Sequence, residues 1–100
     1  MSDITVYGAT GLVGQLVARY LASINAPSVT LAGRNRPVLA ALRDELNPHW
    51  DIAIAAADDA DAVEHMVEHT KVLITVIGPY SLYGDNVVAA CARHGVCLLY

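Results

Sequence analysis

The chain has 100 residues, of which 55% are hydrophobic and 16% are charged, and its formal net charge is −4. This composition suits one small domain with a packed core and excludes a disordered chain. The negative charge gives no general attraction to nucleic acid, and no apolar run is long enough for a membrane span, so neither is an expected partner. Asp3 stands where a signal peptide would be basic, and we therefore expect a cytoplasmic protein.

Five short apolar runs rich in Val and Ile recur along the chain. They are predicted strands and cover residues 4–8, 28–33, 51–57, 71–78 and 96–100. Several are apolar almost without alternation, which is typical of a parallel sheet covered on both faces. Between them lie four stretches of helical period, at residues 11–24, 37–46, 59–69 and 85–94.

The first predicted helix carries only a narrow polar line. Gln15, Arg19 and Ser23 follow the spacing i, i+4, i+8, so nearly all the remaining surface of this helix is expected to be buried. The second helix has Pro37 in its first turn, and the fourth stops at Gly95.

Strict alternation of strands and helices predicts a doubly wound parallel α/β sheet of the Rossmann type, with five strands in the order 3-2-1-4-5. In this order the chain changes direction across the sheet between the first and fourth strands. Ligands of such sheets bind there, at the carboxyl ends of the strands.

The loop that leaves the first strand there reads GATGLVG, residues 8–14. Gly8 permits a sharp exit from the strand, Gly11 permits close approach of a phosphate, and Gly14 lets the following helix pack tightly. The hydroxyl of Thr10 is in reach of a phosphate oxygen. A glycine triplet between a strand and a helix predicts dinucleotide binding, with the pyrophosphate at the helix N-terminus.

The end of the second strand indicates which dinucleotide is bound. Gly33 stands where NAD-binding folds carry an acid for the ribose hydroxyl, and Arg34, Asn35 and Arg36 follow. A missing carboxylate and an available guanidinium favour the 2′-phosphate of NADP, so NAD is the less suitable cofactor.

Asp58 follows the third strand and is a candidate to border the adenine by accepting from its amino group. The alternative is that Asp58 and Asp59 cap the third helix.

Two further groups of residues resemble reactive sites. His65 and His69 have a spacing that can bind zinc, but Glu64 and Glu68 accompany them on a polar face and no third ligand is apparent, so we expect a solvated surface and no metal site. The Tyr-x-x-x-Lys pair of short-chain dehydrogenases is absent, because Val67 stands four residues before the single lysine.

The loop after the fourth strand reads GPYSLYG, residues 78–84. Gly78 and Pro79 end the strand beside the expected nicotinamide position. Tyr80 could donate a proton to a substrate, or these residues could only shape the loop and wall the cofactor pocket.

Three segments together resemble the N-terminal NADP-binding domain of saccharopine dehydrogenase-like oxidoreductases, which include the trans-acting enoyl reductases. They are DITVYGATGLVGQLVARYLA, LAGRNRPVLAAL and VLITVIGPYSLYGDNVVAACARHGVCLLY. The resemblance implies a phosphate loop, a 2′-phosphate site at Arg34 and Asn35, and a nicotinamide-side wall from Gly78 to Tyr80. It names no catalytic acid. The phosphate loop consists of Gly8, Thr10, Gly11, Leu12, Val13 and Gly14.

Proteins of that family continue into a separate substrate domain. The resemblance therefore implies that residues 1–100 are one NAD(P)-binding domain, an N-terminal fragment whose C-terminal substrate domain is missing and which is inactive alone. An uncovered apolar edge strand at residues 96–100 predicts a homo-oligomer. Two alternatives stay open: a non-catalytic NADP-sensing or interaction domain, and a short-chain-type reductase or epimerase with catalytic residues beyond residue 100.

Overall fold

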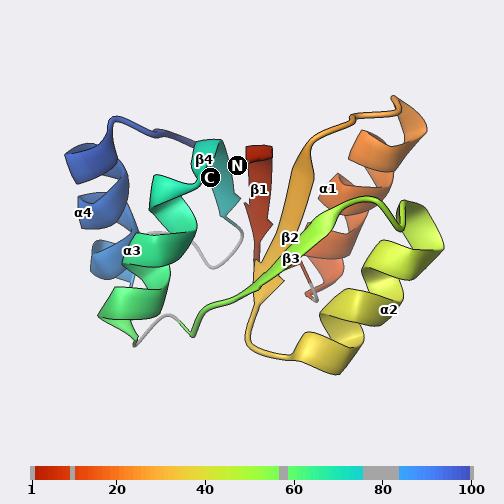
Figure 1. Cartoon of the computed structure of the whole chain (residues 1–100), viewed down its shortest axis with the longest axis horizontal. Helices are drawn as coiled ribbons and strands as arrows, with labels where there is room; N and C mark the ends of the chain where they lie inside the picture. Colours follow the sequence, from red (N-terminus) through yellow and green to blue (C-terminus); the bar gives the residue numbers. More distant parts are fainter. Residues whose placement is uncertain (1, 10, 57–58, 76–83, 100) are drawn as a thin grey trace.

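A computed structural model describes residues 2–9, 11–56, 59–75 and 84–99. These residues form one parallel sheet with two helices on each face (Figure 1). The elements in chain order are β1 (Ser2–Tyr7), α1 (Leu12–Ser23), β2 (Val29–Gly33), α2 (Arg36–Leu46), β3 (Asp51–Ile54), α3 (Ala60–Glu68), β4 (Thr70–Thr75), α4 (Gly84–His94) and β5 (Cys97–Leu99). None of the helices in these ranges is long and apolar enough to cross a membrane.

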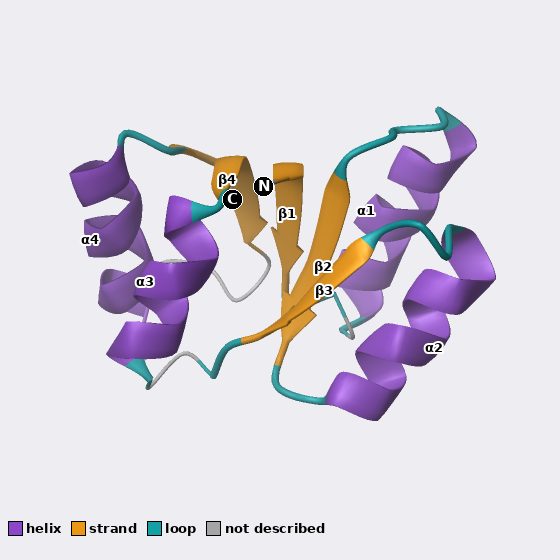
Figure 2. Ribbon diagram, viewed as in Figure 1, coloured by secondary structure: helices purple, strands orange, loops and turns teal. Residues whose placement is uncertain are grey.

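The sheet has five strands in the order β3-β2-β1-β4-β5, as the sequence predicts. All four strand pairs are parallel, and β1 lies at the centre with β2 on one side and β4 on the other (Figure 2). Tyr7 is opposite both Ala32 of β2 and Thr75 of β4, so the carboxyl ends of these three strands are level. The third strand is shorter than expected, since it ends at Ile54.

The helices cover the two halves of the sheet from opposite faces. On one face α1 and α2 pack over β1, β2 and β3, and the apolar cluster between them includes Val6, Leu31, Leu39 and Trp50. On the other face α3 and α4 pack beside β4 and β5, over a second cluster that includes Leu73, Val63 and Cys91. The second cluster also includes Tyr7 of β1 and Ala32 of β2, so α3 packs on these central strands from the face opposite to α1 and α2.

Helix α1 is not the buried helix that the sequence predicts. Only Gly14, Ala18 and Leu21 on this helix are buried, because the sheet and α2 contact one side of it and no described element covers the other. The uncovered side carries a row of exposed apolar residues, here called the α1 stripe. It consists of Leu12, Val13, Leu16, Tyr20 and Ile24, which are 55–80% exposed.

The termini of the other helices agree with their sequence. The Asn35 side chain accepts a hydrogen bond from the Val38 N–H at 3.3 Å and caps α2. Asp59 caps α3 in the same way through the Ala62 N–H at 3.1 Å, so capping is the confirmed role of this aspartate. Gly95 follows α4 with a φ of 65°, a backbone conformation that glycine adopts without strain.

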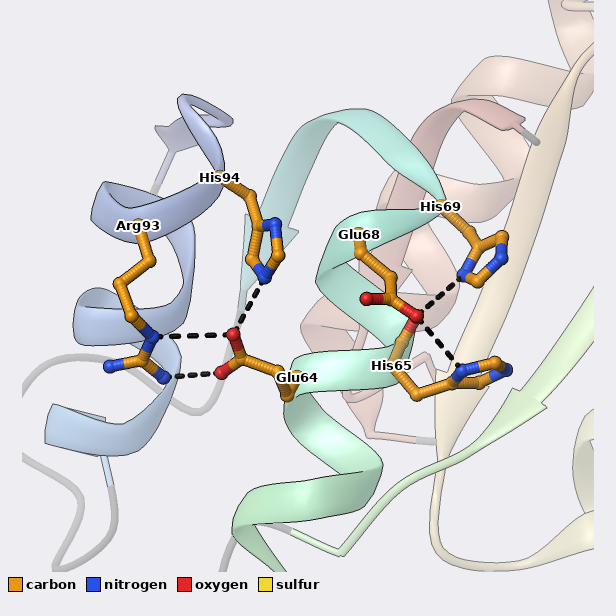
Figure 3. Close-up of polar contacts among 6 residues, drawn as sticks. All are labelled: Glu64, His65, Glu68, His69, Arg93 and His94. Atoms are coloured by element: carbon orange, nitrogen blue, oxygen red, sulfur yellow. Dashed lines mark hydrogen bonds and ion pairs between the residues drawn. The ribbon is translucent and has the colours of Figure 1, made fainter.

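Glu64 joins α3 to α4 (Figure 3). Its carboxylate accepts hydrogen bonds from the Arg93 guanidinium, and His94 Nε2 lies 2.6 Å from Glu64 Oε1. These two partners, Arg93 above all, lower the pKa of Glu64 to about 2. The carboxylate therefore stays charged throughout the physiological range and bridges the two helices.

Candidate functional site

The turn between β1 and α1 is held tightly against β2. The N–H groups of Gly8 and Ala9 both donate to the Ala32 carbonyl, at 2.9 and 3.2 Å, and the Gly11 N–H donates to the Gly8 carbonyl at 3.1 Å. Gly8 has a φ of 85°, in the left-handed region that favours glycine. The chain thus reverses within a few residues at the carboxyl end of the central strand.

Gly14 places the first turn of α1 directly on this loop. A Cβ atom at position 14 would lie 2.1 Å from the Gly8 carbonyl oxygen and 2.8 Å from the Ala9 Cα, where no side chain fits. At Gly11 the same construction gives 3.4 Å to the Gly8 oxygen, which is a near-normal contact. Among the described residues, packing therefore requires a glycine at position 14 but not at position 11.

The N-terminus of α1 is open to a ligand. Its N-cap residue is Gly11, which has no side chain, and within the described ranges no side chain caps this helix and no acid lies in its first turn. The first N–H groups of a helix lack acceptors within it and carry the positive end of its dipole. Since α2 and α3 are capped by Asn35 and Asp59, only α1 of these three helices presents an uncapped end. This end suits the pyrophosphate of a dinucleotide.

Two arginines lie at the neighbouring carboxyl end of β2. Arg34 and Arg36 are exposed, and neither forms an ion pair with any residue that the structure describes. Each of the other four basic side chains has a carboxylate partner, and these are Arg19, Arg43, Lys71 and Arg93. The unpaired guanidinium groups are therefore concentrated beside the glycine turn, where a phosphate group would satisfy them.

Position 33, at the end of β2, has room for a Cβ atom. Among the described residues, such an atom would meet the Leu39 side chain at 3.7 Å, which is ordinary contact. The absence of a carboxylate there leaves the electrostatic environment of Arg34 favourable to an anion. Asn35 is less free than the sequence indicates, because its side-chain oxygen already accepts from Val38 N–H and only its amide group remains to donate.

Five of the expected cofactor residues lie outside the described residues. They are Thr10, Asp58, Gly78, Pro79 and Tyr80. Their roles in cofactor binding stay predictions. The described part of the site consists of the glycine turn, the open end of α1 and the two unpaired arginines.

One supporting residue was not identified from the sequence. Tyr7, the last residue of β1, is buried, and its hydroxyl donates a hydrogen bond to the Ala55 carbonyl at 2.8 Å. This bond ties the carboxyl end of the central strand to the chain leaving β3, at the edge of the sheet where the cofactor is expected. The available indication was a phenol at the end of the strand, immediately before the first glycine of the loop.

Solved structures share this architecture. Apo saccharopine dehydrogenase (L-Glu forming) from Saccharomyces cerevisiae superimposes with a TM-score of 0.80 and 22% identity, over 98% of this chain and 21% of that one. Citrobacter sp. triphenylmethane reductase, solved in complex with NADP(H), gives a TM-score of 0.79 and 24% identity, over 94% of this chain and 34% of that one. At these identities the likeness shows the fold.

Sequence comparison shows the family. The trans-acting enoyl reductases of Mycobacterium ulcerans (strain Agy99) and Mycobacterium leprae (strain TN) are 39% and 41% identical to this chain over 97 residues. These alignments cover 93% of this chain but 23% of each relative, so the chain spans about a quarter of their length. The profile of the family described as the saccharopine dehydrogenase NADP binding domain matches residues 4–99. The chain therefore belongs to the saccharopine dehydrogenase NADP-binding domain family.

Proposed function

We propose that the chain is the NADP-binding module of a longer cytoplasmic oxidoreductase that reduces an enoyl group, with its substrate domain beyond residue 100. The observation that carries this proposal is the uncapped N-terminus of α1 beside two unpaired arginines. The much greater length of the mycobacterial trans-acting enoyl reductases supports a second domain.

Each part of the site has a task in cofactor binding. The N–H groups at the start of α1 would hold the pyrophosphate, and the bare turn at Gly11 would let it approach the backbone. Arg34 would bind the 2′-phosphate through two parallel hydrogen bonds. When bound, NADPH supplies the hydride, while these residues fix its orientation relative to the substrate.

The test of this proposal is to separate binding from reduction. The 100-residue chain is expected to bind NADPH, detected by fluorescence titration, and to oxidise none of it when an enoyl thioester is added. A hydride acceptor must be held in close contact with the nicotinamide, and such positioning accounts for about 7 to 11 kcal/mol of a barrier. One open crevice without a substrate domain does not supply that positioning.

The full-length protein, assayed in parallel, should oxidise NADPH with the same substrate. Steady oxidation by the 100-residue chain, abolished by Tyr80→Phe, would place the chemistry in this domain and contradict the proposal. Absence of NADPH binding to a folded chain would contradict the cofactor assignment itself.

We also propose that copies of the isolated chain associate through the α1 stripe. Half-buried Val72 and Ile74 of β4 are on the same sheet face as Val6, which packs under α1 and α2, so the uncovered apolar surface extends from the helix onto the sheet. Exposed apolar surfaces of this kind commonly mark contact sites.

Sedimentation of the chain at high micromolar concentration should therefore show a dimer or a larger species. The double variant Leu16→Glu/Tyr20→Glu should sediment as a monomer, because it places two charges in the middle of the stripe. Val38→Glu is the matched control, since Val38 is an exposed apolar residue of α2 outside the stripe, and it should leave association unchanged. A monomeric wild-type chain would contradict the proposal.

A further inference from the structure

A small pocket lies at the opposite end of the sheet from the cofactor edge. Its cavity of about 170 Å³ lies between α3 and the face of β1, β2 and β3 that α3 partly covers. Thr5 pairs with Thr30 and Thr30 pairs with Asp51, so polar residues of three adjacent strands form one row along its floor. The lining residues on the helix side are His65, Met66 and His69.

Two of the pocket's lining residues belong to a cluster of side chains whose types can bind a metal ion. His65, Glu68 and His69 follow the spacing i, i+3, i+4 at the C-terminal end of α3, where His69 is the C-cap, and all three are exposed (Figure 3). One ligand atom of each lies within 4.8 Å of the others. Glu68 Oε1 is 3.2 Å from His65 Nδ1 and 3.8 Å from His69 Nδ1. Glu68, which accompanies the two histidines in the sequence, thus lies where it can serve as a third ligand.

These separations fit a tetrahedral ion. A metal about 2.0 to 2.1 Å from each ligand atom requires about 3.4 Å between ligands; the two distances from Glu68 lie on either side of that value, and the two histidine ligand atoms are within 4.8 Å of each other. Two imidazoles and one carboxylate form a ligand set that zinc and similar divalent ions prefer. In the metal-free form His69 Nδ1 lies 2.8 Å from the His65 carbonyl, and binding replaces this hydrogen bond by a metal bond.

The surroundings leave the cluster free to accept a cation. Arg93 is engaged with Glu64, which points toward α4, whereas Glu68 points toward the two histidines (Figure 3). Asp51, across the pocket, has no ion pair within the described part of the chain and adds negative charge. We propose that His65, Glu68 and His69 bind a divalent transition metal ion of the zinc class, with its open coordination position toward the pocket and Asp51.

The probe is Zn²⁺ itself, titrated calorimetrically into the untagged, metal-free chain. We expect one ion per chain, and His65→Gln and His69→Gln should each weaken binding by about tenfold or more. His49→Gln is the matched control, because His49 is exposed and lies outside the cluster, and it should leave the affinity unchanged. Equal affinity in all variants, or equal loss in the His49 variant, would overturn the proposal.

The absorption spectrum of bound Co²⁺ distinguishes this site from a site with cysteine ligands. Co²⁺ bound by nitrogen and oxygen ligands should show visible d–d bands without a sulfur-to-metal charge-transfer band in the near ultraviolet. A charge-transfer band would place the ion on a thiolate and overturn the assignment. Thermal unfolding in the presence of EDTA should be the same for wild type and the histidine variants, since these side chains are exposed, and this shows that lost binding is not lost folding.

Discussion

Gly14→Ala is expected to destabilise the chain by about 3 kcal/mol and to abolish NADPH binding. The added methyl group would lie 2.1 Å from the Gly8 carbonyl oxygen and 2.8 Å from both the Gly8 carbonyl carbon and the Ala9 Cα. All three atoms belong to backbone fixed by hydrogen bonds to β2, so the helix must move away from the sheet, at the upper end of the cost of overpacking. Urea unfolding measures the first effect and nucleotide titration the second.

Gly11→Ala is the matched control in the same loop. Its methyl group would meet the Gly8 oxygen at 3.4 Å, so the free energy of unfolding should change by less than about 1 kcal/mol. NADPH binding should still weaken, because the methyl group stands where the pyrophosphate approaches the backbone. Equal stability of the Gly14 and Gly11 variants would show that the turn yields easily and that Gly14 is not required by packing.

Arg34→Ala should weaken NADPH binding by about 1.5 to 3 kcal/mol, which is roughly tenfold to 150-fold, and leave NADH binding nearly unchanged. The reason is that the exposed guanidinium has no carboxylate partner in the described chain and would lose a charge-assisted pair with the 2′-phosphate. Titration of both nucleotides against wild type and variant measures the difference.

Arg43→Ala serves as the control for a general loss of positive charge. Arg43 is on the same helix as Arg36 but pairs with Asp44, so its removal should affect both nucleotides slightly and equally. If Arg34→Ala weakens NADPH and NADH to the same degree, Arg34 does not bind the 2′-phosphate. Arg34→Lys should recover only part of the NADPH affinity, because an ammonium group cannot form the two parallel hydrogen bonds.

Much of the fold could be predicted because the relevant interactions are local. Apolar runs, the glycine loop, Pro37 and Gly95 mark where each element begins or ends, and alternation of strands and helices leaves few topologies. The extent to which other elements cover α1 could not be predicted in this way. The apolar residues of α1 indicate that the helix needs a partner on almost every side, but the pattern does not say whether this chain contains that partner.

Part of the geometry of the candidate site was predictable. Glycine spacing and the arginines after β2 predict a cofactor edge, since backbone approach and charge are properties of residue type, and the structure has an uncapped helix end and two arginines without ion pairs among the described residues there. The hydrogen bond from Tyr7 to Ala55 was not predictable, because it joins two residues 48 positions apart in the chain. Likewise, the sequence predicts that Asn35 binds the 2′-phosphate, but it does not show that the side-chain oxygen of Asn35 accepts a hydrogen bond from the Val38 N–H.

The central position of β1 has a consequence for the order in which the chain folds. Ser2 of β1 pairs with Thr70 of β4, so forming this strand pair closes a loop of about 70 residues. The loss of chain entropy on closing this loop is larger than for the shorter loops between the other strand pairs. During synthesis on the ribosome, β1, β2 and β3 can assemble with α1 and α2 through contacts that are close in the sequence. The other edge of β1 stays unpaired until β4 has been made. Of the four strand pairs, this one joins residues farthest apart in the sequence, and we expect its formation to be the slowest step of folding.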